Sequence, residues 1–161
     1  MTALKKILES KAKIRFHDCD PFNHLNNSRY IDYFVTARGD HLIDYYGFDI
    51  YKLAAENYIG WVSAQTQISY VVPALLMETV TIQTQLIAYS PKSLLFEASM
   101  WNDDKTVLKS VMWTKLVHFN LKTQSSFQHT EELMQFFKQI VQEEPAKATF
   151  EERVATMRLQ K

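Results

Sequence analysis

The sequence is poor in glycine and cysteine, and each shortage excludes a class of function. Only three glycines occur in 161 residues, so neither a GxGxxG dinucleotide motif nor a GxxxxGK[ST] phosphate loop can form. The single cysteine, Cys19, has no partner for an internal disulfide bond. A chain without structural disulfides suits a reducing compartment, and we therefore expect a cytoplasmic protein.

The sequence also lacks an excess of charge and a long apolar run. Lys plus Arg and Asp plus Glu both number 18, so the formal net charge is zero. Such a chain has no overall electrostatic attraction for nucleic acid or for an anionic membrane surface. No apolar stretch approaches the length of a signal-peptide core or a membrane span. We expect neither a nucleic-acid partner nor a membrane span.

The composition is that of a globular protein. Hydrophobic residues make up 47% of the chain and aromatic residues 13%, and 161 residues are enough to bury a sizeable core. No repeat or low-complexity linker divides the sequence. We therefore predict one domain, whose main body covers residues 1–129 and whose C-terminal helical extension covers residues 130–161.

A long helix is predicted over residues 27–46. Asn26 or Asn27 is a suitable N-cap, and Gly47 stands where a left-handed C′ residue usually ends a helix. Apart from one polar stripe that covers about a third of the circumference, nearly every side chain is apolar, so the helix is expected to be surrounded by protein on most sides. The stripe consists of Asp32, Thr36, Asp40 and Asp44.

Five extended segments are predicted, one before this helix and four after it. The first covers residues 13–18, where Ile14 and Phe16 alternate with polar residues until Pro21. Short connections between the later segments imply antiparallel neighbours. A sheet with one apolar face, beside an apolar helix, suggests that the sheet curls around the helix. The later segments are residues 59–72, 78–89, 93–102 and 106–121.

The C-terminal region is predicted to contain one further helix. It begins at Thr130, carries apolar residues at helical spacing, and ends before Pro145. The tail FEERVATMRLQK is only weakly amphipathic. It is therefore expected either to pack on a partner or to be frayed.

The most polar stretch is HDCDPFNHLNN, residues 17–27, at the start of the long helix. Three interpretations stay open. The Asp and Asn side chains could simply cap a turn. They could bind a metal, although no ligand pair with zinc-type spacing accompanies them. Alternatively, a carboxylate lies beside the helix N-terminus, where free amides stabilise negative charge developing on a carbonyl oxygen. The candidate metal ligands are His17, Asp18, Cys19, Asp20 and His24.

This junction resembles the 4-hydroxybenzoyl-CoA thioesterase and YbgC-like branch of the hotdog-fold acyl-CoA thioesterases. The family pattern D-x-D-x-x-G-H-x-N-N-x-x-Y corresponds to DCDPFNHLNNSRY, residues 18–30. The Ala-Arg pair of the family helix corresponds to Ala37–Arg38. The resemblance covers about residues 13–123, and the order of one strand, one helix and four strands agrees with it.

The resemblance implies an α+β hotdog fold, in which a five-stranded antiparallel sheet wraps a long central helix, followed here by a C-terminal helix. It implies hydrolysis of an acyl-CoA substrate to the free acid and CoA, without a metal or other cofactor. The family also implies a homodimer, or a homotetramer built from two dimers, with the active site at the subunit interface.

The same resemblance implies roles for particular residues. Asp20 matches the catalytic carboxylate and would act as nucleophile or general base. The backbone N–H near Asn27 would polarise the thioester carbonyl. His24 and either Asn26 or Asn27 match polar positions that orient the carboxylate, the water or the thioester. Tyr30 matches an aromatic position that lines the pocket.

Two positions depart from the family pattern. Asn23 replaces the usual glycine, and asparagine tolerates the left-handed conformation that such a turn requires. Val35 replaces an acid found in some family helices, which leaves Asp20 as the obvious catalytic carboxylate. Asp18 is expected to be a structural acid at the end of the strand.

Two rival functions remain open. Because the hotdog fold also serves in ligand sensing, the chain could be a non-catalytic acyl-CoA or acyl-carrier binding module. Hotdog dehydratases use a histidine and an acid on a different motif, with which the D-x-D-x-x-x-H-x-N-N spacing does not agree. The sequence does not identify the acyl chain.

Overall fold

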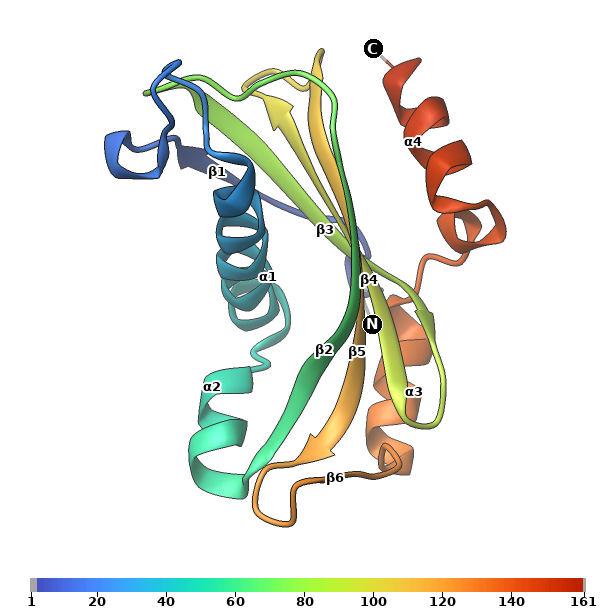
Figure 1. The fold of residues 1–161 in the computed structure, drawn as a ribbon. Coiled ribbons are helices and arrows are strands. Elements are labelled where there is room, and N and C mark those ends of the chain that lie inside the picture. The colour runs from blue at the N-terminus through green and yellow to red at the C-terminus, as the bar shows by residue number, and fades with distance from the viewer. Residues whose placement is uncertain (1–2, 161) are drawn as a thin grey trace.

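A long helix lies against one face of a curved antiparallel sheet in the computed structural model, which describes residues 3–160 (Figure 1). The strands are ordered β1-β3-β4-β5-β2 across the sheet, and the short β6 pairs with β5. This arrangement is the hotdog fold that the resemblance implies. The strands are β1 (Leu8–Lys13), β2 (Ile59–Tyr70), β3 (Thr79–Tyr89), β4 (Ser93–Asn102), β5 (Leu108–Asn120) and β6 (Ser125–Ser126). The helices are α1 (Tyr30–Tyr46), α2 (Ile50–Lys52), α3 (Glu131–Ile140) and α4 (Phe150–Arg158).

The predicted limits of the long helix are confirmed. A single 3₁₀ turn, Asn27–Arg29, leads directly into α1, and the Asn26 side chain caps it by accepting the Ser28 N–H. Gly47 has φ 66°, and its N–H donates to the Ile43 carbonyl. The N-cap and the left-handed glycine are both local signals, because each depends on a single residue next to the end of the helix.

The main core lies between α1 and the concave face of the sheet. Phe34 is completely buried there, and Met100 and Met112 of the central strands pack in the same cluster. The expectation that protein surrounds α1 on most sides is wrong for one flank of the helix. Ile31 and Val35 are 37% and 38% exposed in this single chain.

Four of the five predicted strands are confirmed, but the first is misplaced. The strand β1 ends at Lys13, and residues Phe16–Asp18 form a 3₁₀ turn. The pairing of β1 with the distant β3 fixes this limit, since the Arg15 N–H leaves the ladder and donates to the Tyr33 hydroxyl. The expectation that consecutive strands are neighbours fails once, because β2 pairs with β5 and not with β3.

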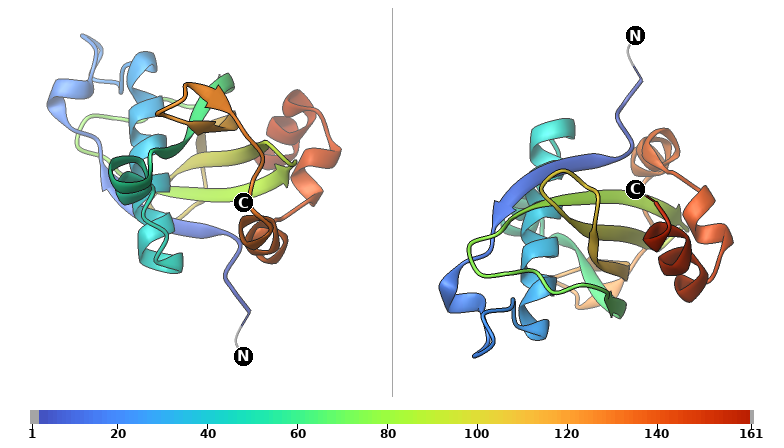
Figure 2. Two further views of the ribbon diagram at one scale, coloured as in Figure 1. Left: turned by 90° about the horizontal axis from the view of Figure 1, so that it is seen from below. Right: turned by 90° about the horizontal axis from the view of Figure 1, so that it is seen from above.

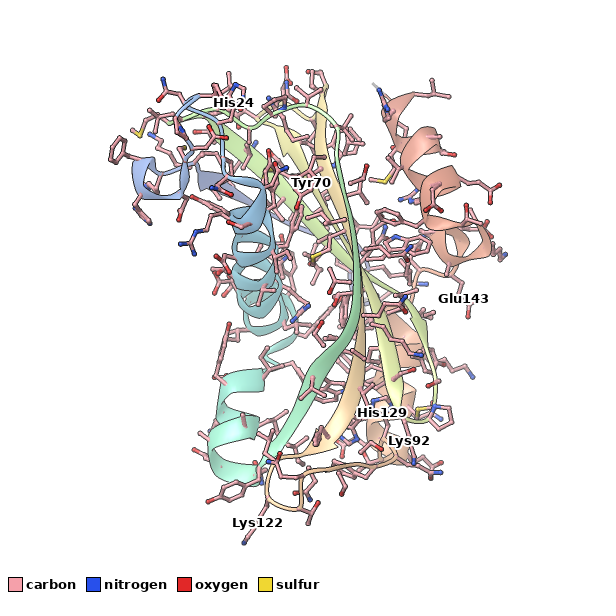
Figure 3. The ribbon with its side chains drawn as sticks, viewed as in Figure 1. His24, Tyr70, Lys92, Lys122, His129 and Glu143 are labelled. Atoms are coloured by element: carbon pink, nitrogen blue, oxygen red, sulfur yellow. The ribbon has the colours of Figure 1, made fainter. Side chains whose placement is uncertain are left out.

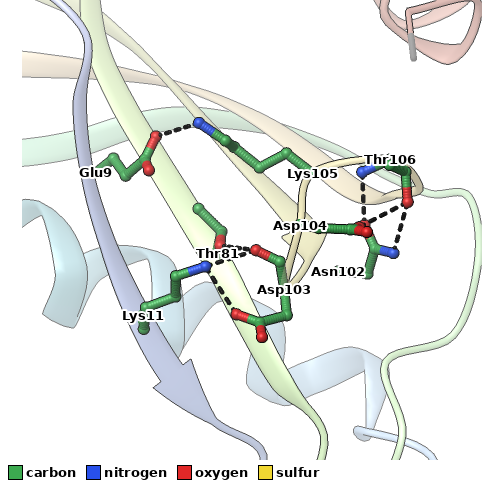
Figure 4. A network of polar contacts seen from close by, with 8 residues as sticks. All are labelled: Glu9, Lys11, Thr81, Asn102, Asp103, Asp104, Lys105 and Thr106. Atoms are coloured by element: carbon green, nitrogen blue, oxygen red, sulfur yellow. Dashed lines mark hydrogen bonds and ion pairs between the residues drawn. The ribbon is translucent and has the colours of Figure 1, made fainter.

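Polar contacts fasten β1 to the turn between β4 and β5 (Figure 4). The Lys11 ammonium lies 2.7 Å from the Asp103 carboxylate, and Lys105 lies 2.8 Å from Glu9. Thr81 of the intervening strand donates to the Asp103 carbonyl at 2.9 Å. These exposed ion pairs contribute little individually, and they supplement the ladder with β3 that positions the short β1.

The C-terminal residues form α3 as predicted and then a further helix, α4. Views along the sheet show α1 and α4 on opposite faces (Figure 2). Phe150, Val154 and Met157 of α4 are buried against Trp113 and its neighbours. The expectation that the tail packs on a partner or frays is therefore wrong, because the chain's own sheet covers its apolar side. Among the described residues, no helix has the length and apolarity needed to cross a bilayer.

Candidate active site

A cleft of about 190 Å³ lies where α1 begins and β2 ends, and it contains four of the five predicted site residues. They come from two segments that are far apart in the sequence, the turn before α1 and the end of β2. Figure 3 shows His24 and Tyr70 at this same end of the molecule. The predicted residues in the cleft are Asp20, His24, Asn27 and Tyr30, and the others that line it are Leu25 and Tyr70 to Pro73.

The turn before α1 holds the Asp20 carboxylate by one oxygen. Oδ1 of Asp20 accepts the backbone N–H of Phe22 at 2.9 Å and of His24 at 3.2 Å. Asn23 adopts φ 63° in this turn, as expected for the residue that replaces glycine. Within residues 3–160 the second oxygen, Oδ2, has no hydrogen-bond partner. One oxygen therefore orients the carboxylate while the other remains available to a substrate or a water.

Asn27 supplies an amide at the start of the helix. Its N–H has no protein acceptor in the described part of the chain, since the first amides of a helix have no preceding turn to donate to, and Asn26 caps the Ser28 amide instead. Its carbonyl oxygen accepts the Tyr70 hydroxyl at 2.9 Å, which fixes this peptide against β2. A free amide at the positive end of a helix is suited to bind an oxygen that gains negative charge.

His24 and Asn26 occupy different positions relative to the cleft. The half-buried His24 lines it, and its imidazole forms no hydrogen bond with residues 3–160. The exposed Asn26 does not line it. The Asn26 side-chain oxygen accepts the Ser28 N–H at 3.0 Å and the Ser28 hydroxyl at 2.9 Å. In this chain Asn26 therefore shapes the helix start, whereas His24 can meet a bound molecule.

Two tyrosines form the inner wall of the cleft. Tyr30 is 2% exposed, and its hydroxyl accepts the Ala74 N–H at 3.1 Å. Burial raises the pKa of Tyr30, so this phenol stays neutral at ordinary pH. The ring of Tyr70 meets it edge-on, with 5.1 Å between the ring centres. Tyr70 was not predicted as a site residue, because no local signal in the sequence brings the end of β2 to the start of α1.

A buried ion pair supports the wall formed by residues 71–73. Lys109, which is 6% exposed, donates to the Pro73 carbonyl at 3.0 Å and lies 3.1 Å from the Glu78 carboxylate. Its carbonyl oxygen accepts the N–H groups of Val71 and Val72. Residues 71–73, which line the cleft with Asp20, are therefore held by the ammonium group and by the backbone carbonyl of Lys109.

Asp18 lies outside the cleft and has a structural contact. Its carboxylate accepts the Tyr33 hydroxyl at 2.7 Å, and burial, with Asp18 nearby, raises the pKa of Tyr33 to about 12. Burial and the two neighbouring acids raise the pKa of Cys19, which disfavours a thiolate. Residues 3–160 contain no group of three or more His, Cys, Asp or Glu side chains arranged to hold a metal ion.

Comparison with known proteins places the chain among thioesterases. The model of the thioesterase-like superfamily matches residues 14–160. The long-chain acyl-CoA thioesterase FadM of Escherichia coli K12 is 28% identical over 135 residues, which cover 83% of this chain and 99% of FadM. The resemblance to hotdog acyl-CoA thioesterases is thus confirmed at the level of the family, while the branch within it stays a prediction.

Solved structures agree with the fold. The probable thioesterase YbaW from Escherichia coli superimposes with a TM-score of 0.71 at 26% identity, covering 84% of this chain and 99% of YbaW. The DHNA-CoA thioesterase from Staphylococcus aureus gives a TM-score of 0.75 at 16% identity, with 82% and 89% of the two chains covered. At that identity the second likeness describes the fold alone.

Proposed function

The chain belongs to the thioesterase-like superfamily, and on this premise we propose that it hydrolyses an acyl-CoA thioester to the free acid and CoA, with Asp20 as its catalytic carboxylate. One observation carries the proposal: Asp20 and Asn27 line the same cleft, and Oδ2 of Asp20 and the N–H of Asn27 lack partners within residues 3–160. A thioester carbonyl placed between them would meet a hydrogen-bond donor at its oxygen and a carboxylate at its carbon.

The two groups divide the chemistry between them. The Asn27 N–H donates to the thioester oxygen and stabilises the negative charge that develops as the carbonyl carbon becomes tetrahedral. Asp20 either removes a proton from an attacking water or attacks the carbon itself. In both routes the C–S bond breaks and CoA leaves as a thiol after gaining a proton. Water supplies one oxygen of the free acid, except when an anhydride is hydrolysed at the Asp20 carbonyl, where the acid keeps an Asp20 oxygen and water replaces it on the carboxylate. His24, with an unengaged imidazole in the cleft, orients the water or the thioester.

Isotope incorporation separates the two routes. A single turnover in ¹⁸O-water puts label into the Asp20 side chain only if the carboxylate attacks and an anhydride is then hydrolysed at Asp20. If Asp20 acts as a base, or if an anhydride is hydrolysed at its acyl carbonyl, the label appears in the released acid alone. Mass spectrometry of the peptide that contains Asp20 therefore demonstrates the nucleophilic route when the label is found there.

We also propose that the active unit is a dimer formed along the edge of β2. This strand is 12 residues long, lies at the sheet edge, and exposes six consecutive residues, 62–67. A long uncovered edge readily pairs with another strand. The exposed Ile31 and Val35 of α1 lie on the same stripe as Arg38, whose side chain lines a cavity together with β2. Pairing at this edge would cover both features, and two such dimers would form the tetramer.

The dimer can be tested at the bulge in β2. Ala64 has no register partner on β5, so Ala64→Pro removes one edge N–H at a position where proline is tolerated. Analytical ultracentrifugation should show that the wild-type chain is dimeric or tetrameric and that the variant shifts toward monomer. A variant that assembles as the wild type does would contradict pairing at this edge.

The activity itself is tested by release of free thiol from a panel of acyl-CoA substrates. Turnover of at least one acyl-CoA, with CoA and the free acid as the only products, is the expected result. Calorimetric binding of acyl-CoA without thiol release would instead favour the non-catalytic binding module.

A further inference from the structure

A second cavity lies farther along α1, away from the Asp20 cleft. It has a volume of about 280 Å³, roughly twice that of an apolar cavity known to bind benzene. Its walls come from α1, the segment after α1, β2, β4, β5 and α3, and it shares no lining residue with the cleft. The lining is mostly apolar and includes Leu42, Phe48, Trp61, Phe96, Leu116 and Phe136.

Arg38 places a positive charge in this apolar setting. Its guanidinium lies over the Phe96 ring, 5.7 Å from the ring centre, and both side chains line the cavity. Burial lowers the pKa of Arg38, because a charge is less stable where it is partly removed from water. Within residues 3–160 no carboxylate lies at ion-pair distance from Arg38, and it donates no hydrogen bond to the protein.

Comparison with the other arginines shows that this situation is unusual. Arg153 is largely buried and forms two hydrogen bonds with the Glu97 carboxylate. Arg29 pairs with Asp32 at 3.2 Å. Arg15 and Arg158 form no such ion pair but are exposed to water. Arg38 alone among the described arginines is neither fully exposed to water nor paired with a carboxylate.

Tyr51 is the other polar side chain at this position. It packs so closely against α1 that a Cβ at Gly39 would collide with its hydroxyl oxygen. Tyr51 and Arg38 both line the cavity. Tyr51, which lines the cavity, is 55% exposed, so the cavity reaches the surface beside this side chain.

We propose that this cavity binds an apolar chain that ends in a carboxylate, with Arg38 as the counter-ion and the Tyr51 hydroxyl as a second donor. A shielded guanidinium without a partner is unfavourable, and a planar carboxylate matches its donors in a charge-assisted pair. An apolar chain without a charged end would fill the cavity but would leave the Arg38 guanidinium unpaired. A strongly hydrated phosphate group does not suit the apolar walls.

The carboxylate has two chemical sources. It can be the head of a free fatty acid, or the distal carboxyl of a dicarboxylic acyl group whose thioester end reacts elsewhere. Arg38 follows Tyr30 by eight residues, a rise of about 12 Å along α1, and Ile31 and Val35 lie between them on the same stripe. An acyl chain along this stripe would connect the Asp20 cleft with Arg38, and only this second source rests on the proposed hydrolysis.

Calorimetric titration with decanoate and decanol tests the site on the intact protein. The wild type should bind decanoate about ten- to a hundredfold more tightly than decanol, the range given by a charge-assisted hydrogen bond. Arg38→Met keeps the apolar length of the side chain and should bind both probes alike, while Arg38→Lys should retain part of the preference. Arg29→Met is the matched control, because it removes an exposed arginine near the start of the helix, and it should bind as the wild type does.

Equal affinity of the wild type for the acid and the alcohol would overturn the proposal, as would an unchanged preference in a folded Arg38→Met variant. Asp20→Asn should keep the wild-type preference for decanoate, so this result stands even if no thiol release is ever found. The source is then identified by kinetics. A distal carboxyl is indicated if wild type, but not Arg38→Met, prefers ω-carboxydecanoyl-CoA to decanoyl-CoA. A free acid is indicated if added decanoate alters decanoyl-CoA turnover only when Arg38 is present.

Discussion

The two faces of the sheet use buried charge in opposite ways. On the convex face, Glu97 is 2% exposed and both of its oxygens are fully engaged. It accepts hydrogen bonds from Arg153 at 2.8 and 2.9 Å, from Trp113 at 2.9 Å and from Gln85 at 2.8 Å. On the concave face, Oδ2 of Asp20 and the guanidinium of Arg38 have no hydrogen-bond or ion-pair partner among residues 3–160, although the guanidinium lies over the Phe96 ring.

This difference separates stability from function. A buried charge whose hydrogen bonds are all satisfied within the chain has nothing left to offer a ligand, and Glu97 serves to fasten α4 to the sheet. A charged group with unsatisfied hydrogen-bonding capacity inside a cleft or cavity lowers stability. Such a group is typical of a site where a bound molecule supplies the missing partner. Changes on the concave face should therefore alter chemistry and binding, whereas changes on the convex face should alter unfolding.

The largest effect is expected at Asp20. Asp20→Asn keeps an oxygen that can accept the Phe22 and His24 amides but removes the carboxylate that we propose as base or nucleophile. Thiol release should fall by about a hundredfold to ten thousandfold. Asp18→Asn is the matched control, because it changes an acid two residues away whose partner, the Tyr33 hydroxyl, can also donate to an amide oxygen. Asp18→Asn should retain most activity, and near-normal turnover by Asp20→Asn would refute the assignment.

The convex face is tested at Glu97. Glu97→Gln leaves the Arg153 guanidinium beneath α4 without its counter-ion, and removing one partner of a buried pair costs about 3 to 5 kcal/mol. Because Arg153 retains some access to water, the low end of that range is expected in urea unfolding. Glu9→Gln, which breaks the half-exposed pair with Lys105, should cost at most about 1 kcal/mol. The turnover of the folded Glu97→Gln protein should change little, and a selective loss of turnover would break the division between the two faces.

The smallest effect concerns pH and the buried histidines. Nε2 of His129 accepts the Trp61 N–H at 3.0 Å, and Nδ1 lies 3.0 Å from the Ser90 carbonyl, so the ring is neutral with its proton on Nδ1. Burial lowers the pKa values of His129, His118 and His41 below 6.5.

Below about pH 6.5 the unfolded chain therefore binds protons that the folded chain does not, and the free energy of unfolding should fall as the pH falls from that value. Urea unfolding at pH 8 and at pH 5 measures this loss, in a range above the titration of the carboxylates. His129→Gln, whose amide oxygen can still accept the Trp61 N–H, should reduce the difference between the two pH values. An equal free energy of unfolding of the wild type at pH 8 and pH 5 would contradict the lowered pKa values of the three histidines.

The sequence predicts those parts of the fold and site that depend on neighbours along the chain. Asn26 and Gly47 define α1 because caps act over a few residues, and the turn that holds Asp20 lies within residues 20–24. The end of β1 was misjudged because the distant β3 sets it. Tyr70, which completes the cleft, likewise reaches the start of α1 only through the folding of β2.

Arg38 shows the same limit most clearly. The sequence identified Ala37–Arg38 as a family pair, yet nothing local reveals that the guanidinium would lie over Phe96 with no acid beside it. That property depends on which side chains come from β4, β5 and α3 to form the cavity wall. Periodicity therefore predicts which helices and strands form. Whether a charged side chain finds a hydrogen-bond or ion-pair partner can be seen only in the folded structure.

The most direct test of the account is a distance in the complex of Asp20→Asn with an acyl-CoA that the wild type hydrolyses. A crystal structure should place the thioester oxygen about 2.7 to 3.1 Å from the Asn27 backbone nitrogen, with the residue 20 side chain against the carbonyl carbon. A thioester bound outside the cleft between the start of α1 and Tyr70, or turned so that its oxygen faces away from Asn27, would contradict the account.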